Sequence, residues 1–102
     1  IVNLSGGNQQ KVVLGKWLLE EPQILFIDEP TKGIDVGAKT EIYKIMNELT
    51  EQGVAIVMVS SDMPELISMS DRCIVLSNGR ITGEFNNEEI TQDRVMQAAL
   101  AE

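Results

Sequence analysis

The hydrophobic positions follow two different spacings along the chain, and segments of the two kinds alternate. Residues 7–21, 36–53 and 86–102 have apolar side chains at helical spacing, whereas the short runs 23–28 and 54–59 are apolar almost throughout. Short runs of that kind are typical of strands covered on both faces. We therefore expect two buried strands, with helices before, between and after them.

Several residues indicate where the helices begin and end. Pro22 is expected to end the first helix and Gly53 the second, because proline cannot donate a helical hydrogen bond and glycine readily adopts the left-handed conformation. Asp62 is the expected N-cap of a short helix over 61–70, with Pro64 in its first turn. In the first of the three longer helices, the residues at helical spacing are Val12, Val13, Lys16, Trp17, Leu18 and Leu19. The expected apolar positions of the other two are Ile42, Ile45, Met46 and Leu49, then Ile90, Val95, Met96 and Leu100.

The last third of the chain predicts a β-hairpin and a helix. Asn78-Gly79 separates two apolar runs within 72–85, which is a strong hairpin signal. Buried strands that alternate with helices indicate an α/β domain with a mostly parallel sheet flanked by helices. In such sheets ligands bind beyond the carboxyl ends of the strands. Asp28 and Glu29 follow one strand and 60–62 follows the next, so we expect the chemistry there.

Composition narrows the classes of protein. The chain has 102 residues, of which 43% are hydrophobic and 24% charged, enough for one small globular domain. Its net charge of −8 argues against a nucleic-acid partner bound through a broad basic face. Cys73, the only cysteine, is expected to be a buried thiol. The absence of histidine excludes His-based catalysis and most zinc sites, and no apolar run approaches the roughly 20 residues of a membrane span.

The two acids after the first strand suit phosphoryl transfer. Neighbouring residues of a strand point to opposite sides, so one carboxylate can hold Mg²⁺ while the other faces a water. The alternative is a solvated strand end followed by a helix-capping turn, without chemistry. Asp28 and Glu29 alone do not decide between the two interpretations.

A second candidate is the segment 4–8, LSGGN, which precedes the first helix. Gly6 and Gly7 allow close approach of the backbone to a ligand, and the free amides of a helix N-terminus favour an anion. The Ser5 hydroxyl can donate a further hydrogen bond to a phosphate. The alternative is an ordinary serine cap in a flexible turn.

Taken together, LSGGNQQKV, then ILFIDEP, then GID resemble the ATP-binding subunits of ABC transporters, over Asn3 to about Phe85. LSGG is similar to the signature motif of that family, and ILFIDEP to its Walker B strand with the acid that follows. The segments QQKV, DEPTKGIDVGAK and VSSDMPEL resemble the second nucleotide-binding half of bacterial importers of ribose, galactose and xylose.

The resemblance implies that two such domains sandwich ATP between them. Ser5, Gly6 and Gly7 match signature positions that contact the γ-phosphate of an ATP held by the opposite domain. Asn8 stands where glutamine is commoner, and both are neutral amides. Lys11 follows in the signature helix, where a solvated charge without a role is an equally good interpretation.

The resemblance also assigns roles around the first strand. Asp28 matches the Walker B carboxylate that holds Mg²⁺ through water, and Glu29 matches the catalytic base that polarises the attacking water. Asp35 matches the D-loop aspartate that links the two sites of the dimer. Trp17 and Tyr43 match no catalytic position, and we expect both to be packing residues.

The chain departs from the family pattern in two important ways. It has no G-x-x-x-x-G-K-[ST] loop, so we expect a single partial nucleotide-binding domain over 1–102, a fragment without the Walker A portion. Ser61 stands at the place of the switch histidine, and a serine lacks the charge and the reach of an imidazole. The strands over 54–59 and 72–77 would flank the missing P-loop strand. We expect this gap to be closed by repair of the sheet or by pairing with another copy.

The leading functional prediction is an ATPase subunit, with ATP and Mg²⁺, that powers monosaccharide import as a peripheral protein on the cytoplasmic face of the bacterial inner membrane. Its expected partners are a second nucleotide-binding half, permease subunits and, indirectly, a periplasmic sugar-binding protein, with no nucleic acid. The alternative is a degenerate half that completes the partner's ATP site and docks the membrane subunit. An ABC-type ATPase of DNA repair or translation is disfavoured by the acidic charge. The isolated chain is not expected to bind ATP tightly.

Overall fold

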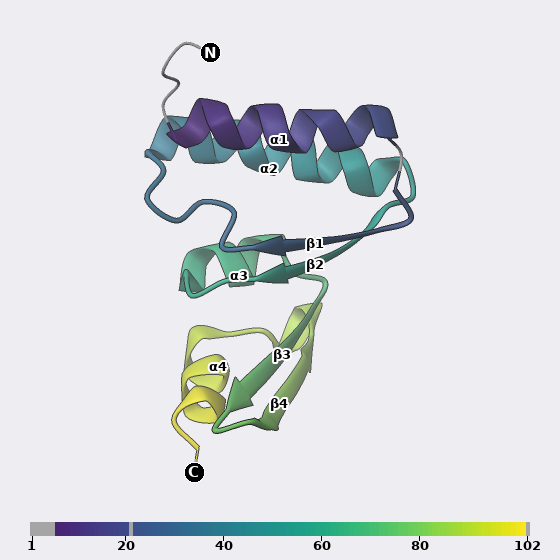
Figure 1. The fold of residues 1–102 in the computed structure, drawn as a ribbon. Coiled ribbons are helices and arrows are strands. Elements are labelled where there is room, and N and C mark those ends of the chain that lie inside the picture. The colour runs from purple at the N-terminus through teal and green to yellow at the C-terminus, as the bar shows by residue number, and fades with distance from the viewer. Residues whose placement is uncertain (1–5, 21, 102) are drawn as a thin grey trace. The chain divides into compact units, whose positions relative to one another are not determined.

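The protein is described by a computed structural model that covers residues 6–20 and 22–101 (Figure 1). The chain divides into two compact units, Ile1–Ser60 and Ser61–Glu102. We refer to them as the first unit and the second unit, and each is described by itself. No helix in the described ranges is long and apolar enough to cross a membrane.

The first unit alternates helices and strands. Its elements are α1 (Gly6–Glu20), β1 (Ile24–Asp28), α2 (Val36–Glu51) and β2 (Ala55–Val59). The strands pair in parallel, in a register that runs from Ile24 opposite Ala55 to Asp28 opposite Val59. The two helices pack against each other and begin at the same end of the unit (Figure 1). This parallel arrangement follows from β1, which returns the chain from the end of α1 to the start of α2.

The strands of the first unit are covered on one face only. Leu25 and Ile27 are buried, whereas Phe26 is 75% exposed and Val57 is 47% exposed. The prediction of strands buried on both faces is therefore wrong for this chain. The reason is that α1 and α2 lie on the same side of the pair (Figure 1), while successive strand side chains point to opposite faces.

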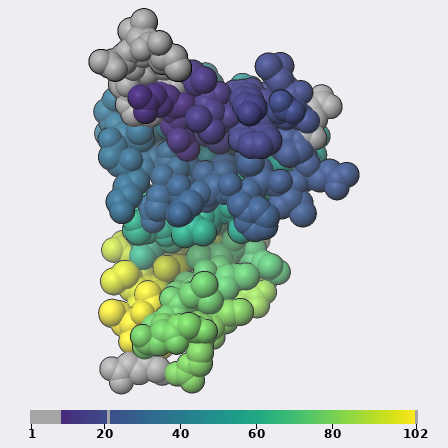
Figure 2. All heavy atoms as spheres, viewed as in Figure 1, coloured from purple at the N-terminus to yellow at the C-terminus, as the bar shows by residue number. Residues whose placement is uncertain are grey.

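Helix α2 contributes more buried side chains to the core of the first unit than α1 does. Ile42, Met46 and Leu49 are buried, as their spacing predicts. In α1 Leu14 is buried instead of the expected positions, and Leu19 is 88% exposed. Figure 2 shows α1, in purple, at the surface of the first unit. Because α1 packs along one stripe against α2, a wider apolar set on α1 finds no cover within the unit; this set comprises Val12, Val13 and Leu19.

The second unit is a short helix, a hairpin and a C-terminal helix. Its elements are α3 (Met63–Met69), β3 (Arg72–Ser77), β4 (Arg80–Asn86), the 3₁₀ helix η1 (Asn87–Glu89) and α4 (Gln92–Ala99). The predicted hairpin is confirmed: β3 and β4 are antiparallel, and Asn78 and Gly79 have φ of 52° and 78°. Its core cluster consists of Cys73, Val75, Ile90, Val95 and Ala98, with Met63 and Phe85 packed against it.

The single helix predicted over 86–102 is two elements in the structure. The Asn86 N–H donates to Glu89 Oε1 at 3.1 Å and closes η1 as a separate turn. Thr91 then caps α4, with its Oγ1 accepting from the Arg94 N–H at 3.2 Å. Between the two, Ile90 is extended and buried. The helical spacing therefore has to be counted from Thr91 and not from Asn86. Leu100, which was expected on the apolar side, is 73% exposed.

The described strands form two two-stranded sheets, β1 with β2 and β3 with β4. The strands that flank the predicted gap, β2 and β3, belong to different sheets, so one repaired sheet is not observed in the described part of the chain. Pairing with another copy stays a prediction. The expected combination of a parallel pair, flanking helices, a hairpin and a terminal helix is confirmed.

The hairpin and α4 are held together by a close backbone approach. Thr82 Oγ1 donates to the Ala98 carbonyl at 2.7 Å, and Ser77 Oγ donates to the Ala101 carbonyl at 2.9 Å. A Cβ added at Gly83 would lie 2.9 Å from Ala98 Cβ and 2.9 Å from the Phe85 ring. Glycine is required at position 83 by this proximity.

We predict that Gly83→Ala lowers the free energy of unfolding of the second unit by about 1–3 kcal/mol, the usual cost of overpacking. Urea denaturation followed by circular dichroism measures this loss. Gly15→Ala is the matched control, because a Cβ added there meets no atom within 4 Å other than those of its chain neighbours and its own helix backbone, and alanine is the better helix former. Equal behaviour of the two variants would contradict the account of the contact between the hairpin and α4.

The buried Cys73 thiol gives a second prediction. Cys73 is 4% exposed, and burial raises the pKa of its thiol, so less thiolate is present at a given pH than in an unfolded chain. We expect alkylation by iodoacetamide at pH 8 to be at least about tenfold slower in the folded protein than in urea. Equal rates in both conditions would show that the core around Cys73 opens readily.

Candidate functional site

The acidic turn, residues 28–35, follows β1 and carries most of the predicted chemistry. Asp28 ends the strand opposite Val59 and has an exposed side chain. One residue later, the Glu29 N–H donates to the Val59 carbonyl at 2.7 Å. This bond extends the parallel ladder beyond β1 and fixes the backbone of the predicted catalytic acid to the carboxyl end of β2.

Glu29 adopts the left-handed backbone conformation, with φ of 49°. Such a conformation is unfavourable for a residue with a long side chain, and it clusters at functional sites. The strand alternation that predicts opposite directions for the two acids therefore ends at Asp28. The Glu29 carboxylate leaves the sheet from a turn rather than from a strand.

The rest of the acidic turn is closed by local hydrogen bonds and anchored by burial. The Lys32 N–H donates to the Glu29 carbonyl at 3.3 Å, and the Ile34 N–H donates to the Thr31 carbonyl at 3.1 Å. Thr31 is 2% exposed. Gly33 has φ of 75°, a conformation that glycine adopts without strain. The local hydrogen bonds and the buried Thr31 thus fix the backbone of the acidic turn.

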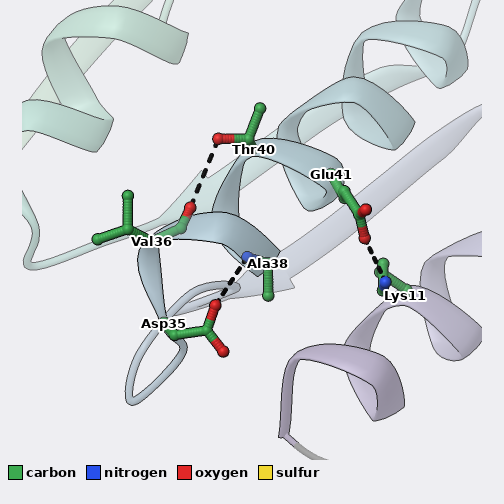
Figure 3. Close-up of polar contacts among 6 residues, drawn as sticks. All are labelled: Lys11, Asp35, Val36, Ala38, Thr40 and Glu41. Atoms are coloured by element: carbon green, nitrogen blue, oxygen red, sulfur yellow. Dashed lines mark hydrogen bonds and ion pairs between the residues drawn. The ribbon is translucent and has the colours of Figure 1, made fainter.

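Asp35 ends the acidic turn as the N-cap of α2. Its Oδ1 accepts from the Ala38 N–H at 2.9 Å, as Figure 3 shows, and its backbone is extended. The capping bond satisfies one of the free amides of the helix. The residue predicted to link the two halves of the dimer therefore also has a structural role within this chain.

The described part of the signature segment lies at the start of α1. Gly6, Gly7 and Asn8 are in the first turn of α1, and Ser5 lies outside the described residues. Lys11, one turn further, forms an ion pair with Glu41 of α2 (Figure 3). Side-chain exposures of 29% and 55% limit the pair to about 0.2–1 kcal/mol of stability. Lys11 is thus a paired charge rather than a solvated one.

The predicted switch position belongs to the other unit. Ser61 is exposed and begins the second unit, whereas Glu29 lies in the first. That Ser61 acts beside Glu29 stays a prediction. Trp17 and Tyr43 are half-buried, and the Lys16 ammonium lies 5.6 Å from the centre of the Trp17 ring, which is consistent with packing roles.

The acidic residues suit a magnesium ion that keeps most of its waters. No group of three or more Asp, Glu, Cys or His side chains in the described ranges is arranged to hold a metal. Mg²⁺ is commonly held by one or two carboxylates together with substrate phosphates. The exposed Asp28 carboxylate fits that arrangement, and an all-protein cage is not formed by the described side chains.

Two features of the structure were missed by sequence reasoning. Glu41 was not singled out, because its partner Lys11 is 30 residues away in the chain. Glu65 of α3 is 2% exposed, and its N–H donates to Asp62 Oδ1 at 3.0 Å. An acid three residues after an N-cap is a known capping signal, so the position of Glu65 could have been noticed.

Comparison with known proteins agrees with this geometry. A family model described as "ABC transporter" matches residues 1–32. The chain is 65% identical over 99 residues to the xylose import ATP-binding protein XylG of Geobacillus kaustophilus, covering 97% of the chain and 20% of that protein. It is 62% identical over 97 residues to the ribose import ATP-binding protein RbsA of Bacillus subtilis, covering 95% and 20%. The chain thus spans about a fifth of the length of these relatives.

Solved structures show the same fold. The crystal structure of the ADP conformation of an ATP-binding cassette of an ABC transporter superposes with a TM-score of 0.80 at 27% identity, over 98% of this chain and 41% of the other. The fold is therefore that of a part of an ATP-binding cassette. The chain belongs to the ATP-binding proteins of ABC transporters, and the curated relatives named above are sugar-import proteins. Its placement in the second nucleotide-binding half stays a prediction.

We predict that Asp35→Ala lowers the free energy of unfolding by about 1 kcal/mol, because α2 loses its cap. Asp35→Asn retains an oxygen that can accept from the Ala38 N–H, so its stability should stay near that of the wild type. Chemical denaturation of the two variants measures the difference. A loss with asparagine as large as that with alanine would show that the charge, not the cap, stabilises α2.

Proposed function

We propose that the chain is part of the ATP-binding subunit of an ABC importer and takes part in the ATP hydrolysis that powers monosaccharide uptake. The observation that carries the proposal is the acidic turn, with Glu29 bonded to the end of β2 at 2.7 Å, in a chain 65% identical to a xylose import ATP-binding protein. Because the chain covers 20% of that relative, the activity is proposed for the whole protein.

In the proposed reaction Glu29 is the general base. A water attacks the γ-phosphorus of ATP, the bond to the bridging oxygen breaks, and ADP and phosphate are released. The Glu29 carboxylate accepts a hydrogen bond from that water and draws its proton away as the new bond forms. The backbone bond to Val59 holds this carboxylate on the sheet edge. Mg²⁺, when bound, neutralises phosphate charge, and the exposed Asp28 carboxylate would hold one of its waters.

The signature segment is proposed to act on a second ATP. Gly6 and Gly7 open α1, whose free amides face an anion favourably, and Ser5 and Asn8 are proposed to complete this contact. The ATP concerned is held by the opposite nucleotide-binding half. Asp35 is proposed to connect the two sites across that interface.

The proposed assembly is peripheral to the cytoplasmic face of the bacterial inner membrane. Its proposed partners are a second nucleotide-binding half and permease subunits, with a periplasmic sugar-binding protein acting indirectly. The net charge of −8 gives no support to a nucleic-acid partner. No P-loop sequence lies within the chain, so we propose that the isolated chain is inactive.

A second candidate function follows from Ser61. A serine at the switch position favours a degenerate site that hydrolyses ATP poorly. In this case the chain would complete the partner's site through its signature segment and help to dock the membrane subunit. Glu29 argues for the working site, because backbone conformations as unfavourable as that of Glu29 cluster at functional sites.

We predict that Glu29→Gln in the full-length subunit lowers kcat for ATP hydrolysis by about 10²-fold or more, the loss expected for a general base. Glu48→Gln is the matched control, because Glu48 is an exposed carboxylate on α2, and it should leave the rate unchanged. A phosphate-release assay at saturating ATP measures both. A Glu29→Gln rate close to that of the wild type would favour the degenerate half.

A further inference from the structure

The two motif-bearing helices of the first unit are joined by a charge pair close to their starts. Helix α1 begins at Gly6, and Lys11 is five residues further; α2 begins at Val36, and Glu41 is five residues further. Since the helices are parallel and begin at the same end (Figure 1), the ion pair connects equivalent turns. Figure 3 shows the two side chains reaching toward each other from their helices.

Each helix start carries one part of the proposed site. The signature residues Gly6 to Asn8 form the first turn of α1, and Asp35 caps α2 through the Ala38 N–H. The position of α1 along α2 therefore sets the position of the signature segment relative to Asp35. Any residue that fixes this position acts on both motifs at once.

Apolar packing alone does not fix that position well. In α1 the buried apolar side chain is Leu14, whereas α2 buries Ile42, Met46 and Leu49. Trp17 and Leu18 of α1 are half-buried. Hydrophobic contact is not directional, so this packing alone does not select one position of α1 along α2. The Lys11–Glu41 ion pair joins one turn of α1 to one turn of α2, so it favours the position in which these two side chains meet.

We propose that Lys11 and Glu41 are positioning residues: their ion pair holds the signature helix in register with α2, so that the first turn of α1, Gly6 to Asn8, and Asp35 keep one relative position. The effect on catalysis rests on the proposed ATPase function. The pairing of the helices does not, and it can be measured without any activity. Neither side chain is assigned a contact with ATP.

The test exchanges the two charges in the full-length subunit. Lys11→Glu and Glu41→Lys each place like charges opposite each other, whereas the double variant restores an opposite pair with reversed polarity. We expect each single variant to lower kcat by about tenfold or more, the cost of a displaced catalytic group. KM for ATP should change less than kcat, because Lys11 and Glu41 are assigned no contact with the nucleotide and act only through the position of the signature helix. The double variant should recover most of kcat.

The matched control uses an exposed pair on the same helix. Lys44→Glu and Glu48→Lys make the same charge changes on the outer side chains of α2, and they should leave kcat and the melting temperature unchanged. The Lys11 and Glu41 variants should also keep their melting temperatures to within a few degrees. A lowered kcat at an unchanged melting temperature separates positioning from unfolding.

The second readout is the distance between α1 and α2. Spin labels at Val13 of α1 and Val36 of α2, which are exposed at 51% and 80%, report the distance between the two helices when Cys73 and any further cysteine of the full-length subunit are replaced by alanine. We expect a single narrow distance distribution in the wild type and the double variant, and a shifted or broader one in each single variant. An unchanged distribution in the single variants overturns the proposal, whatever their activity.

The two readouts separate the possible failures. If the wild-type subunit hydrolyses no ATP, the proposed function is wrong, and the distance measurement alone decides the role of the pair. If the single variants lose activity and the charge exchange does not restore it, Lys11 acts directly on a ligand and the positioning role is overturned. Recovery of both kcat and the narrow distribution by the double variant supports it.

Discussion

The hydrogen bond from the Glu29 N–H to the Val59 carbonyl, at 2.7 Å, is the constraint on which the rest of the first unit depends. It continues the parallel ladder past Asp28 and turns the chain at the edge of the sheet where ligands bind in α/β folds. From that point the buried Thr31 and the local bonds of the acidic turn lead directly to Asp35, which begins α2. Helix α2 then carries Glu41 to Lys11. One backbone bond thus determines where the acid, the cap and the signature helix lie.

This arrangement holds an unfavourable residue in place. A glutamate with φ of 49° is less stable than a glycine would be at that position, and the ladder bond together with the buried turn compensates for the difference. Strain retained at a carboxylate on a ligand-binding edge is typical of functional sites. The left-handed backbone also directs the side chain in a way that a regular strand does not, which separates Glu29 from the strand residues and from Asp28.

Most helices and strands were predictable from residues that act on their immediate neighbours in the chain. Features that depend on contacts between distant residues were not predictable. Pro22, Gly53, Asp62 and Asn78-Gly79 act within a few residues, so the ends of α1 and α2, the α3 cap and the hairpin were predictable. The exposure of one strand face was not predictable, because the sequence shows that Phe26 is apolar but does not show whether another element covers it. The Lys11–Glu41 pair joins residues that are 30 positions apart, and no hydrophobic or charge periodicity in the sequence indicates it. In the candidate site, the sequence motifs indicated Asp28, Glu29 and Asp35. The left-handed backbone conformation of Glu29 became visible only in the structure.

The central claim is that the sheet itself fixes the acidic turn, and residue-resolved amide hydrogen exchange of the full-length protein tests it most directly. The account predicts that the Glu29 amide exchanges as slowly as the amides of β1 and on the order of 100-fold more slowly than that of Gly33 in the same turn. Exchange of the Glu29 amide at the Gly33 rate would mean that the ladder ends at Asp28. That result would contradict the account, because the sheet would then not hold the backbone of Glu29.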